Sequence, residues 1–251
     1  MSAGTLLFDV GNTFVKWAVV RDGRFALAGR LAFDELKRLF PTLAQPEHVL
    51  CASVASPTQE AHLLEMFPAD FPAPWFARSR ARLGDLMNSY ADPAKMGADR
   101  WLAMLAARVR SRERVCVVDV GSALTIDFVS HEGQHEGGYI IPGRALMLRA
   151  LTLDTDRVRF ETVDNPQLGP GHSTAEAVEH GVLIAQSGAI RLALEEAEKS
   201  GPVSRVLLCG GGAEPVAEHL GRSQELTPNL VFEGLCEQAF LEQVVLQRLL
   251  C

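Results

Sequence analysis

The chain has 251 residues, of which 47% are hydrophobic and 22% are charged, as expected for a globular protein with a sizeable core. Its formal net charge of −7 argues against nucleic acid or an anionic membrane as the main partner, because those partners require a basic surface. The five cysteines are scattered, the N-terminus lacks the features of a leader, and no apolar run reaches membrane-spanning length. We therefore expect a cytoplasmic protein.

The first half of the chain is predicted to open with an antiparallel meander of three strands, joined by tight turns that include Arg21–Arg24. A short helix with Asp34 as its N-cap, a buried strand and a helix opened by Ser56 and Pro57 follow. The predicted strands cover residues 5–10, 14–20, 25–31 and 48–54, and the helices cover 34–40 and 57–66.

The second half repeats this plan after a helix at 97–110. Strands are predicted at 114–121, 124–130 and 137–143, helices at 144–153, 174–199 and 235–250, and a strand, glycine turn and helix at 203–220. The order indicates a duplicated α/β architecture with a cleft between the halves. We expect the domains to be 1–112 and 113–251, with the boundary in a charged link.

Each half carries an Asp-Val-Gly triplet directly after a predicted strand, Asp9–Gly11 and Asp119–Gly121. An Asp at a strand end followed by Gly lets backbone N–H groups approach an anion, and two such turns could hold a polyphosphate while the carboxylates bind cations. One triplet alone would be an ordinary strand-to-turn Asp. Lys16 lies on the strand face opposite Val15, as a phosphate neighbour or as a solvated lysine.

Other segments have a structural and a functional interpretation. Asp99 could cap a helix, or it could be a carboxylate base beside the guanidinium of Arg100, with Tyr90 nearby. Thr174 lies at a predicted helix start, where a hydroxyl commonly caps. The glycine turn 210–212 is suited to the adenosine end of a nucleotide. The H-E-x-x-H at 131–135 contains a glycine and falls at a predicted hairpin tip, so we reject a zinc site there.

Five motifs together resemble those of type III pantothenate kinases, a family of the acetate and sugar kinase/Hsp70/actin superfamily. They are D-V-G-N-T-x-x-K at 9–16, G-A-D-R at 97–100, D-V-G-S-A at 119–123, G-G-Y-I-I-P-G at 137–143 and S-T-x-E-A-V-x-x-G at 173–181. The resemblance implies two ribonuclease H-like domains of the actin and sugar-kinase type, an interdomain nucleotide cleft and a homodimer. It also implies phosphorylation of pantothenate by ATP, the first step of coenzyme A biosynthesis.

The same resemblance implies roles for individual residues. The ATP phosphate loop would comprise Asp9, Val10, Gly11, Asn12, Thr13, Phe14, Val15 and Lys16, and Ser122 would contact ATP, although many members have Thr there. Pantothenate would be held by Tyr90, Gly97, Ala98, Asp99, Arg100 and Thr174, with Asp99 as the catalytic proton acceptor. Asp119 would bind a monovalent cation, K⁺ or NH₄⁺, and Asp9 would bind Mg²⁺ through water.

Two alternatives use the same fold. The chain could be another small-molecule kinase or a phosphatase, which would share both Asp-Val-Gly turns but would not need Gly97–Arg100 and Tyr90. It could also be a transcriptional accessory protein that keeps the kinase fold. A degenerate member of that kind should have lost Asp9, Asp99 or Asp119, and all three are present.

Overall fold

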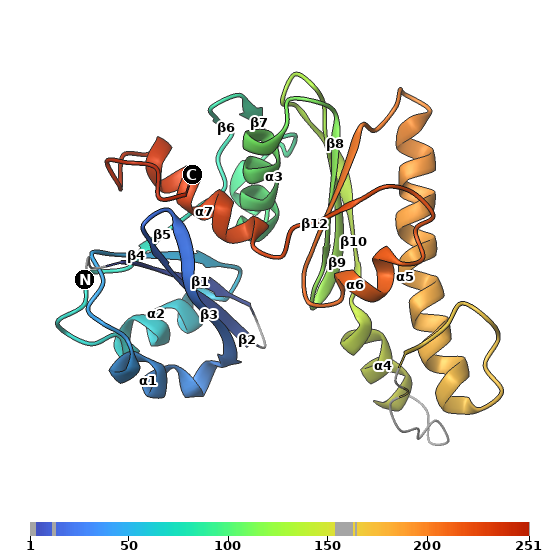
Figure 1. Cartoon of the computed structure of the whole chain (residues 1–251), viewed down its shortest axis with the longest axis horizontal. Coiled ribbons are helices and arrows are strands. Elements are labelled where there is room, and N and C mark those ends of the chain that lie inside the picture. Colours follow the sequence, from blue (N-terminus) through green and yellow to red (C-terminus); the bar gives the residue numbers. More distant parts are fainter. Residues whose placement is uncertain (1–3, 12–13, 154–162, 164, 251) are drawn as a thin grey trace. The chain divides into compact units, whose positions relative to one another are not determined.

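The computed structural model describes residues 4–11, 14–153, 163 and 165–250, and its chain divides into two compact units (Figure 1). The first unit combines Met1–Arg110 with Asn229–Cys251, and the second is Ser111–Pro228. Neither Asn12 nor Thr13 lies within the described residues, so their predicted part in the phosphate loop has no structural account here.

The first unit is built on a five-stranded sheet with the order β3-β2-β1-β4-β5. β1, β2 and β3 are antiparallel, as predicted, and β4 runs parallel to β1. The turn between β2 and β3 has positive φ angles at Asp22 (50°) and Gly23 (73°), which matches the twist of a tight hairpin. The strands are β1 Thr5–Val10, β2 Phe14–Arg21, β3 Arg24–Ala32, β4 His48–Ser53 and β5 Trp75–Phe76, with a separate hairpin of β6 Arg82–Leu83 and β7 Leu86–Met87.

Helices lie on both faces of this sheet: α1 and α2 on one side, α3 and α7 on the other (Figure 1). Because side chains alternate along a strand, Leu6, Phe8 and Val10 enter the core beneath α1 and α2, while Leu7 and Asp9 face the side of α3 and α7. The helices are α1 Leu36–Leu39, α2 Pro57–Met66, α3 Ala98–Arg110 and α7 Leu230–Leu241, with 3₁₀ turns at Phe33–Glu35, Phe40–Thr42 and Pro93–Lys95.

The second unit repeats the same strand order, β10-β9-β8-β11-β12. β8, β9 and β10 are antiparallel, and β11 is parallel to β8. The predicted duplication is therefore confirmed at the level of sheet topology. Its elements are β8 Val115–Val120, β9 Ala123–Val129, β10 His135–Pro142, β11 Arg205–Cys209, β12 Glu225–Leu226, α4 Arg144–Leu153, α5 Thr174–Glu198 and α6 Ala213–Ala217.

The H-E-x-x-H segment is the tip of the hairpin between β9 and β10, as predicted, with Gly133 at φ 87° in the turn. Its second histidine, His135, points into the unit, where Nε2 lies 3.0 Å from Oδ1 of Asp127. Both side chains are buried. His135 thus forms part of the core of the second unit.

Two predicted helix starts had different outcomes. α2 begins as predicted, because Oγ of Ser56 accepts the backbone N–H of Gln59 at 3.3 Å and Pro57 occupies the first turn. The preceding helix does not begin as predicted, because Asp34 does not act as its N-cap. There the carboxylate of Glu35 accepts the backbone N–H of Ala32 at 2.9 Å, and the segment 33–42 divides into short 3₁₀ and α turns.

The C-terminal helix differs from its prediction in position and in the unit it joins. It was predicted at 235–250 within a second domain of 113–251, but α7 covers Leu230–Leu241 and packs on α3, β1 and β4 of the first unit. Glycine 234 permits this packing, since a Cβ there would overlap the carbonyl oxygen of Leu102. Across the part of the chain described here, no helix is both long and apolar enough to cross a membrane.

Candidate active site

The first Asp-Val-Gly turn follows β1, an apolar strand that is buried on both faces. Asp9 pairs with Lys16 across β1 and β2, and Nζ of Lys16 lies 3.5 Å from Oδ2 of Asp9. The backbone N–H of Gly11 donates to the carbonyl of Phe14 at 3.1 Å, which closes the turn. A carboxylate and a lysine therefore stand together at the entrance of a glycine turn.

Burial dominates the electrostatics of this carboxylate. Only 15% of the Asp9 side chain is exposed, and this desolvation raises its pKa above the ordinary value, while the charge and hydrogen bond of Lys16 act in the opposite direction. Mg²⁺ typically takes one or two protein carboxylates and otherwise water and phosphate oxygens. Asp9 is an oxygen donor of that kind near the end of β1, so the residues present are compatible with Mg²⁺.

The G-A-D-R motif forms the start of α3. Oδ1 of Asp99 accepts the backbone N–H of Arg100 at 2.7 Å, and Nη1 of Arg100 donates to the hydroxyl of Tyr90 at 2.7 Å. Arg100 is only 5% exposed. A Cβ on Gly97 would lie 2.6 Å from Oδ1 of Asp99, so a side chain there would displace this carboxylate from its position. The structure thus brings together the carboxylate, the guanidinium and the tyrosine that the sequence singled out.

Val54 adjoins both of these clusters, although no motif of the sequence marks it. Its backbone N–H donates to the carbonyl of Val10 at 3.2 Å, and its Cγ1 lies 3.7 Å from the Cβ position on Gly97. The turn after β1 and the start of α3 therefore adjoin the same residue. The available signal was that β4 is a buried strand, since parallel neighbours end at the same edge of a sheet.

In the second unit, three glycine segments meet at the end of β8. The amide of Gly121 donates to the carbonyl of Ala123 at 3.0 Å, and that of Gly143 donates to Ser122 at 3.1 Å. From the turn after β11, the amide of Gly212 donates to the carbonyl of Val120 at 2.9 Å. The predicted turns at 121, 143 and 210–212 are therefore neighbours within one unit.

The carboxylate of Asp119 lies among these glycines. A Cβ on Gly121 would be 3.2 Å from its Oδ1, and a Cβ on Gly210, whose φ is 88°, would collide with the same oxygen. The glycines keep the space beside this carboxylate clear of side chains. A carboxylate can coordinate K⁺ through oxygen or accept hydrogen bonds from NH₄⁺, so Asp119 is compatible with the expected monovalent cation.

Thr174 is the first residue of α5 and is exposed. The cap of this helix is the neighbouring Ser173, whose Oγ accepts the backbone N–H of Glu176 at 3.2 Å. The hydroxyl of Thr174 is therefore not needed as the cap. Further along α5, the buried carboxylate of Glu179 forms two hydrogen bonds with Arg144, the residue after Gly143, which joins the start of α4 to α5.

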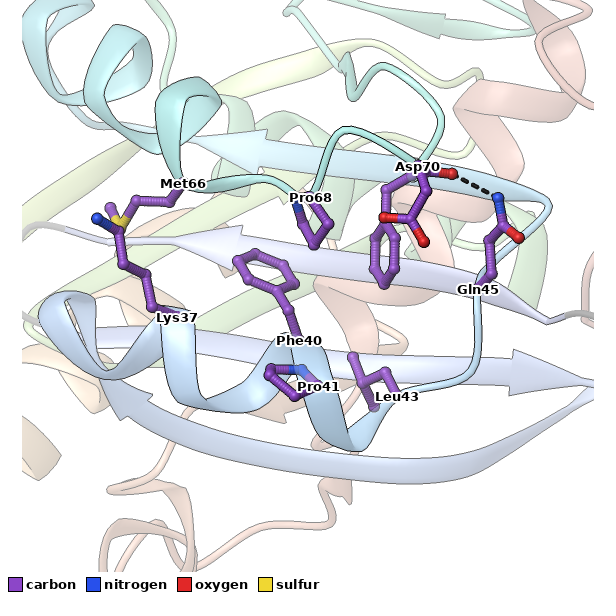
Figure 2. Close-up of a pocket in the computed structure, with 9 residues that line it drawn as sticks. Lys37, Phe40, Pro41, Leu43, Gln45, Met66, Pro68 and Asp70 are labelled. Carbon is purple, nitrogen blue, oxygen red and sulfur yellow. Dashed lines mark hydrogen bonds between the residues drawn. The ribbon is translucent and has the colours of Figure 1, made fainter.

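A separate pocket of about 370 Å³ lies on the other side of the first unit's sheet (Figure 2). Its floor includes Phe40 and Met66, which belong to the core beneath α1 and α2, and the side chain of Gln45 donates to the carbonyl of Asp70 at its rim. Asp9 and Lys16 face the opposite side of the sheet. This pocket is therefore not part of the candidate active site.

The two sheets have the same strand order, and in each an Asp-Val-Gly triplet lies at the end of the central strand, β1 or β8. These features define a class of protein: the two-unit fold of the actin and sugar-kinase type. Solved structures agree with this class. A putative Baf family transcriptional activator from Campylobacter jejuni matches with a TM-score of 0.63 at 20% identity, over 96% of this chain and 100% of that one. A putative 2-dehydro-3-deoxygalactonokinase from Sinorhizobium meliloti matches with 0.58 at 14% identity, over 94% and 96%. At such identities the likeness concerns the fold alone.

Sequence comparison identifies the family. The model of the type III pantothenate kinase family matches residues 5–196. Proteins named type III pantothenate kinase from Thiobacillus denitrificans and Marinobacter nauticus are 36% and 37% identical, over 94% and 92% of this chain and 96% of each relative. The chain belongs to the type III pantothenate kinase family.

Proposed function

We propose that the chain transfers the γ-phosphate of ATP to the primary hydroxyl of pantothenate. The observation that carries this proposal is the meeting of two unlike clusters at Val54: the turn of Asp9 and Lys16, suited to phosphate, and the cluster of Asp99, suited to an acid that carries a hydroxyl. Phosphoryl transfer requires such an arrangement, because the protein must place a hydroxyl beside a phosphate and stabilise the charge that develops. Family membership supports the same reaction.

At the acceptor end, Asp99 is the proposed proton acceptor of the pantothenate hydroxyl. Its Oδ1 is oriented by the amide of Arg100, so the carboxylate is held in place before substrate binds. Arg100, positioned by Tyr90, is the proposed partner of the pantothenate carboxylate, because a guanidinium binds carboxylates through two parallel hydrogen bonds. Gly97, Ala98 and Thr174 complete the proposed substrate contacts.

At the donor end, the proposed ATP contacts are residues 9–16 and Ser122. Lys16 is the proposed source of positive charge beside the phosphates, and Asn12 and Thr13 are proposed contacts of the phosphate oxygens. Asp9 is the proposed holder of Mg²⁺ and Asp119 of K⁺ or NH₄⁺. When bound, these cations would supply positive charge that screens the triphosphate.

The test is an assay of ADP formation by the purified protein with ATP, Mg²⁺ and pantothenate, with and without K⁺ or NH₄⁺. We expect pantothenate-dependent turnover that rises when either monovalent cation is added. Galactonate, glycerol and acetate serve as alternative acceptors, and we expect none to replace pantothenate. Turnover with one of these but not with pantothenate would assign the chain to another small-molecule kinase of this fold.

The proposed assembly is a homodimer formed through the second unit. α4 contains five leucine or methionine side chains, yet none of its residues is buried, and the neighbouring edge strand β10 exposes Tyr139 and Ile140. Large apolar side chains exposed on neighbouring elements are a feature of protein–protein interfaces. A second copy of the chain covers such a patch symmetrically, because the same surface serves both partners. The cytoplasmic location expected from the sequence stays a prediction.

Sedimentation of variants tests this assembly. Ile140→Lys with Leu151→Glu places one charge on β10 and one on α4, and we expect the sedimentation coefficient to fall from that of a dimer to that of a monomer. The matched control is Leu246→Glu in the first unit, which is 90% exposed and should leave the coefficient unchanged. A wild-type chain that sediments as a monomer would contradict the proposal.

A further inference from the structure

Three charged side chains, one from each of three adjacent strands, form a row on one face of the first unit's sheet. Asp9 on β1 pairs directly with Lys16 on β2, and Lys16 pairs directly with Arg30 on β3. Residues directly opposite one another in neighbouring strands point to the same face. Arg30 therefore shares the face that carries the Asp9–Lys16 pair.

The guanidinium of Arg30 lies over the ring of Phe14 and not over its strand partner Lys16. Its Cζ lies 3.8 Å from the ring centroid of Phe14, which is two residues before Lys16 and is the first residue of β2 after the glycine turn. Phe14 keeps 40% of its surface exposed. The stacking therefore directs the Arg30 cation along the sheet toward the mouth of the turn that Gly11 and Phe14 close.

The charges of this row leave Arg30 available for an anion. The charge of Lys16 is offset by Asp9 at 3.5 Å, whereas Arg30 forms no hydrogen bond or ion pair with any residue that the structure describes. A guanidinium stacked on an aromatic ring still has its N–H donors free in its own plane, and these donors match the oxygens of a phosphate.

We infer that Arg30 is a further ATP-binding residue, which contacts the triphosphate and is oriented for that contact by stacking on Phe14. The inference rests on the proposed function only in taking ATP as the phosphate donor. It adds a cation to a turn where one lysine is already paired with a carboxylate. Neither the glycine motif nor the spacing of the sequence places Arg30 there, because the contact depends on the register of β2 against β3.

The experiment measures dissociation constants of wild type and Arg30→Ala by calorimetry, for Mg·ATP, inorganic triphosphate and adenosine. We expect Arg30→Ala to weaken Mg·ATP and triphosphate by about 10- to 100-fold, the effect of losing a charge-assisted hydrogen bond, and to leave adenosine within twofold. A purely structural role would weaken all three ligands alike, so the split between triphosphate and adenosine is the decisive readout.

Two further variants sharpen the result. Arg24→Ala removes an exposed arginine from the start of the same strand and should bind all three ligands as wild type does. Phe14→Leu keeps an apolar side chain but removes the ring, so we expect a smaller loss of triphosphate binding. Arg30→Lys covers the case in which Arg30→Ala does not fold, and an intermediate affinity is expected because the charge remains without the planar fork.

The inference is overturned if Arg30→Ala, or Arg30→Lys in its place, binds triphosphate and Mg·ATP within twofold of wild type. It is also overturned if the affinity for adenosine falls by the same factor as that for ATP. Failure of the proposed function is recognised separately, because it would be seen as a wild-type protein that binds ATP without phosphorylating pantothenate.

Discussion

Asp99 is the residue on which the proposed chemistry depends most. Asparagine in its place keeps an oxygen that can accept the amide of Arg100, so the start of α3 should remain formed. It cannot accept a proton at neutral pH. We expect Asp99→Asn to lower kcat by about 10²- to 10⁴-fold, the usual contribution of a positioned base, while the dissociation constant of pantothenate changes little.

The matched control for this change is Asp34→Asn, the same substitution at an exposed position in the first 3₁₀ turn of the first unit. Its kcat should equal that of wild type. A kcat for Asp99→Asn within threefold of wild type would show that another group accepts the proton, or that the transfer needs no base.

Asp9 should make the stability of the ligand-free protein depend on pH. Because burial raises its pKa in the folded state, the folded protein holds the proton more tightly than the unfolded chain does. The associated stability is fully present below the unfolded pKa and is lost as pH rises through the raised, folded pKa. Asp9→Asn removes this loss, so we expect its melting temperature to exceed that of wild type at pH 7.5.

Calorimetric melting at pH 3.5, 5 and 7.5 without nucleotide measures the effect, and the advantage of Asp9→Asn should shrink toward the lowest pH. The same variant should lose most of its turnover, since the carboxylate is the proposed ligand of Mg²⁺. An advantage that stays constant across these pH values would mean that folding does not shift the pKa of Asp9, and a disadvantage that grows as pH rises would mean that the ion pair with Lys16 outweighs burial.

Among single residues, the sequence predicted the positions of those that lie in short motifs. Asp9, Lys16 and Asp99 stand in local patterns whose geometry is settled within a few residues, by the alternation of a strand or the start of a helix. Val54 was missed because its position depends on the pairing of β4 with β1, two strands that lie far apart in the sequence. Arg30 was missed because its place opposite Lys16 depends on the register of the β2–β3 hairpin, which shifts between Val19 and Val20.

At the scale of elements, the crossing of α3 and α7 depends on a glycine. A Cβ on Gly234 would overlap the carbonyl oxygen of Leu102, and this backbone is part of a helix that cannot easily move. We expect Gly234→Ala to destabilise the protein by about 1–3 kcal/mol, the usual effect of overpacking. Equilibrium unfolding in urea measures this loss of stability. We expect kcat to fall together with stability, because α3 carries Asp99.

Gly188→Ala is the matched control, since it is the same substitution within α5, where a Cβ would meet no atom within 4 Å. Alanine there should stabilise the protein by about 0.5–1 kcal/mol through its higher helix propensity. If both variants shifted stability in the same direction, steric contact at Gly234 would not be the cause.

The element boundaries were predictable where local signals are strong. The cap of Ser56 and Pro57 placed α2 correctly, and apolar runs placed β1, β8 and β11. The end of the last helix was misplaced because apolar residues continue past Leu241, where the helix ends. Beyond it, Gln243 has φ 59°, and the backbone amides of residues 244 and 245 donate to the carbonyl of Ala239. That ending is a tertiary outcome, since Arg80 and Gln238 bind Glu242 at the same point.

At the scale of the whole molecule, the first unit is discontinuous in sequence. Two bidentate ion pairs attach its C-terminal part, Arg80 with Glu242 and Arg110 with Glu233, and Gln238 donates to the carbonyl of Arg78 at 2.8 Å. A sequence with two matching halves indicates two consecutive domains, and duplication alone gives no sign that the last helix returns to the first. The return is visible only in the contacts of α7 with α3, β1 and β4.

This arrangement predicts which fragments fold. A fragment of residues 111–228 contains the whole second unit and should melt in one cooperative transition. A fragment of 111–251 follows the boundary that the sequence suggested, but it lacks the surface of the first unit on which α7 packs. The side chains of α7 that this surface buries include Leu230, Phe232 and Leu235. We expect it to bind the dye ANS strongly and to form higher oligomers in sedimentation experiments, because that apolar face would be exposed. Equal ANS binding and equal sedimentation behaviour of the two fragments, apart from the difference in mass, would mean that α7 does not need the first unit, and residues 229–251 would then belong to the second.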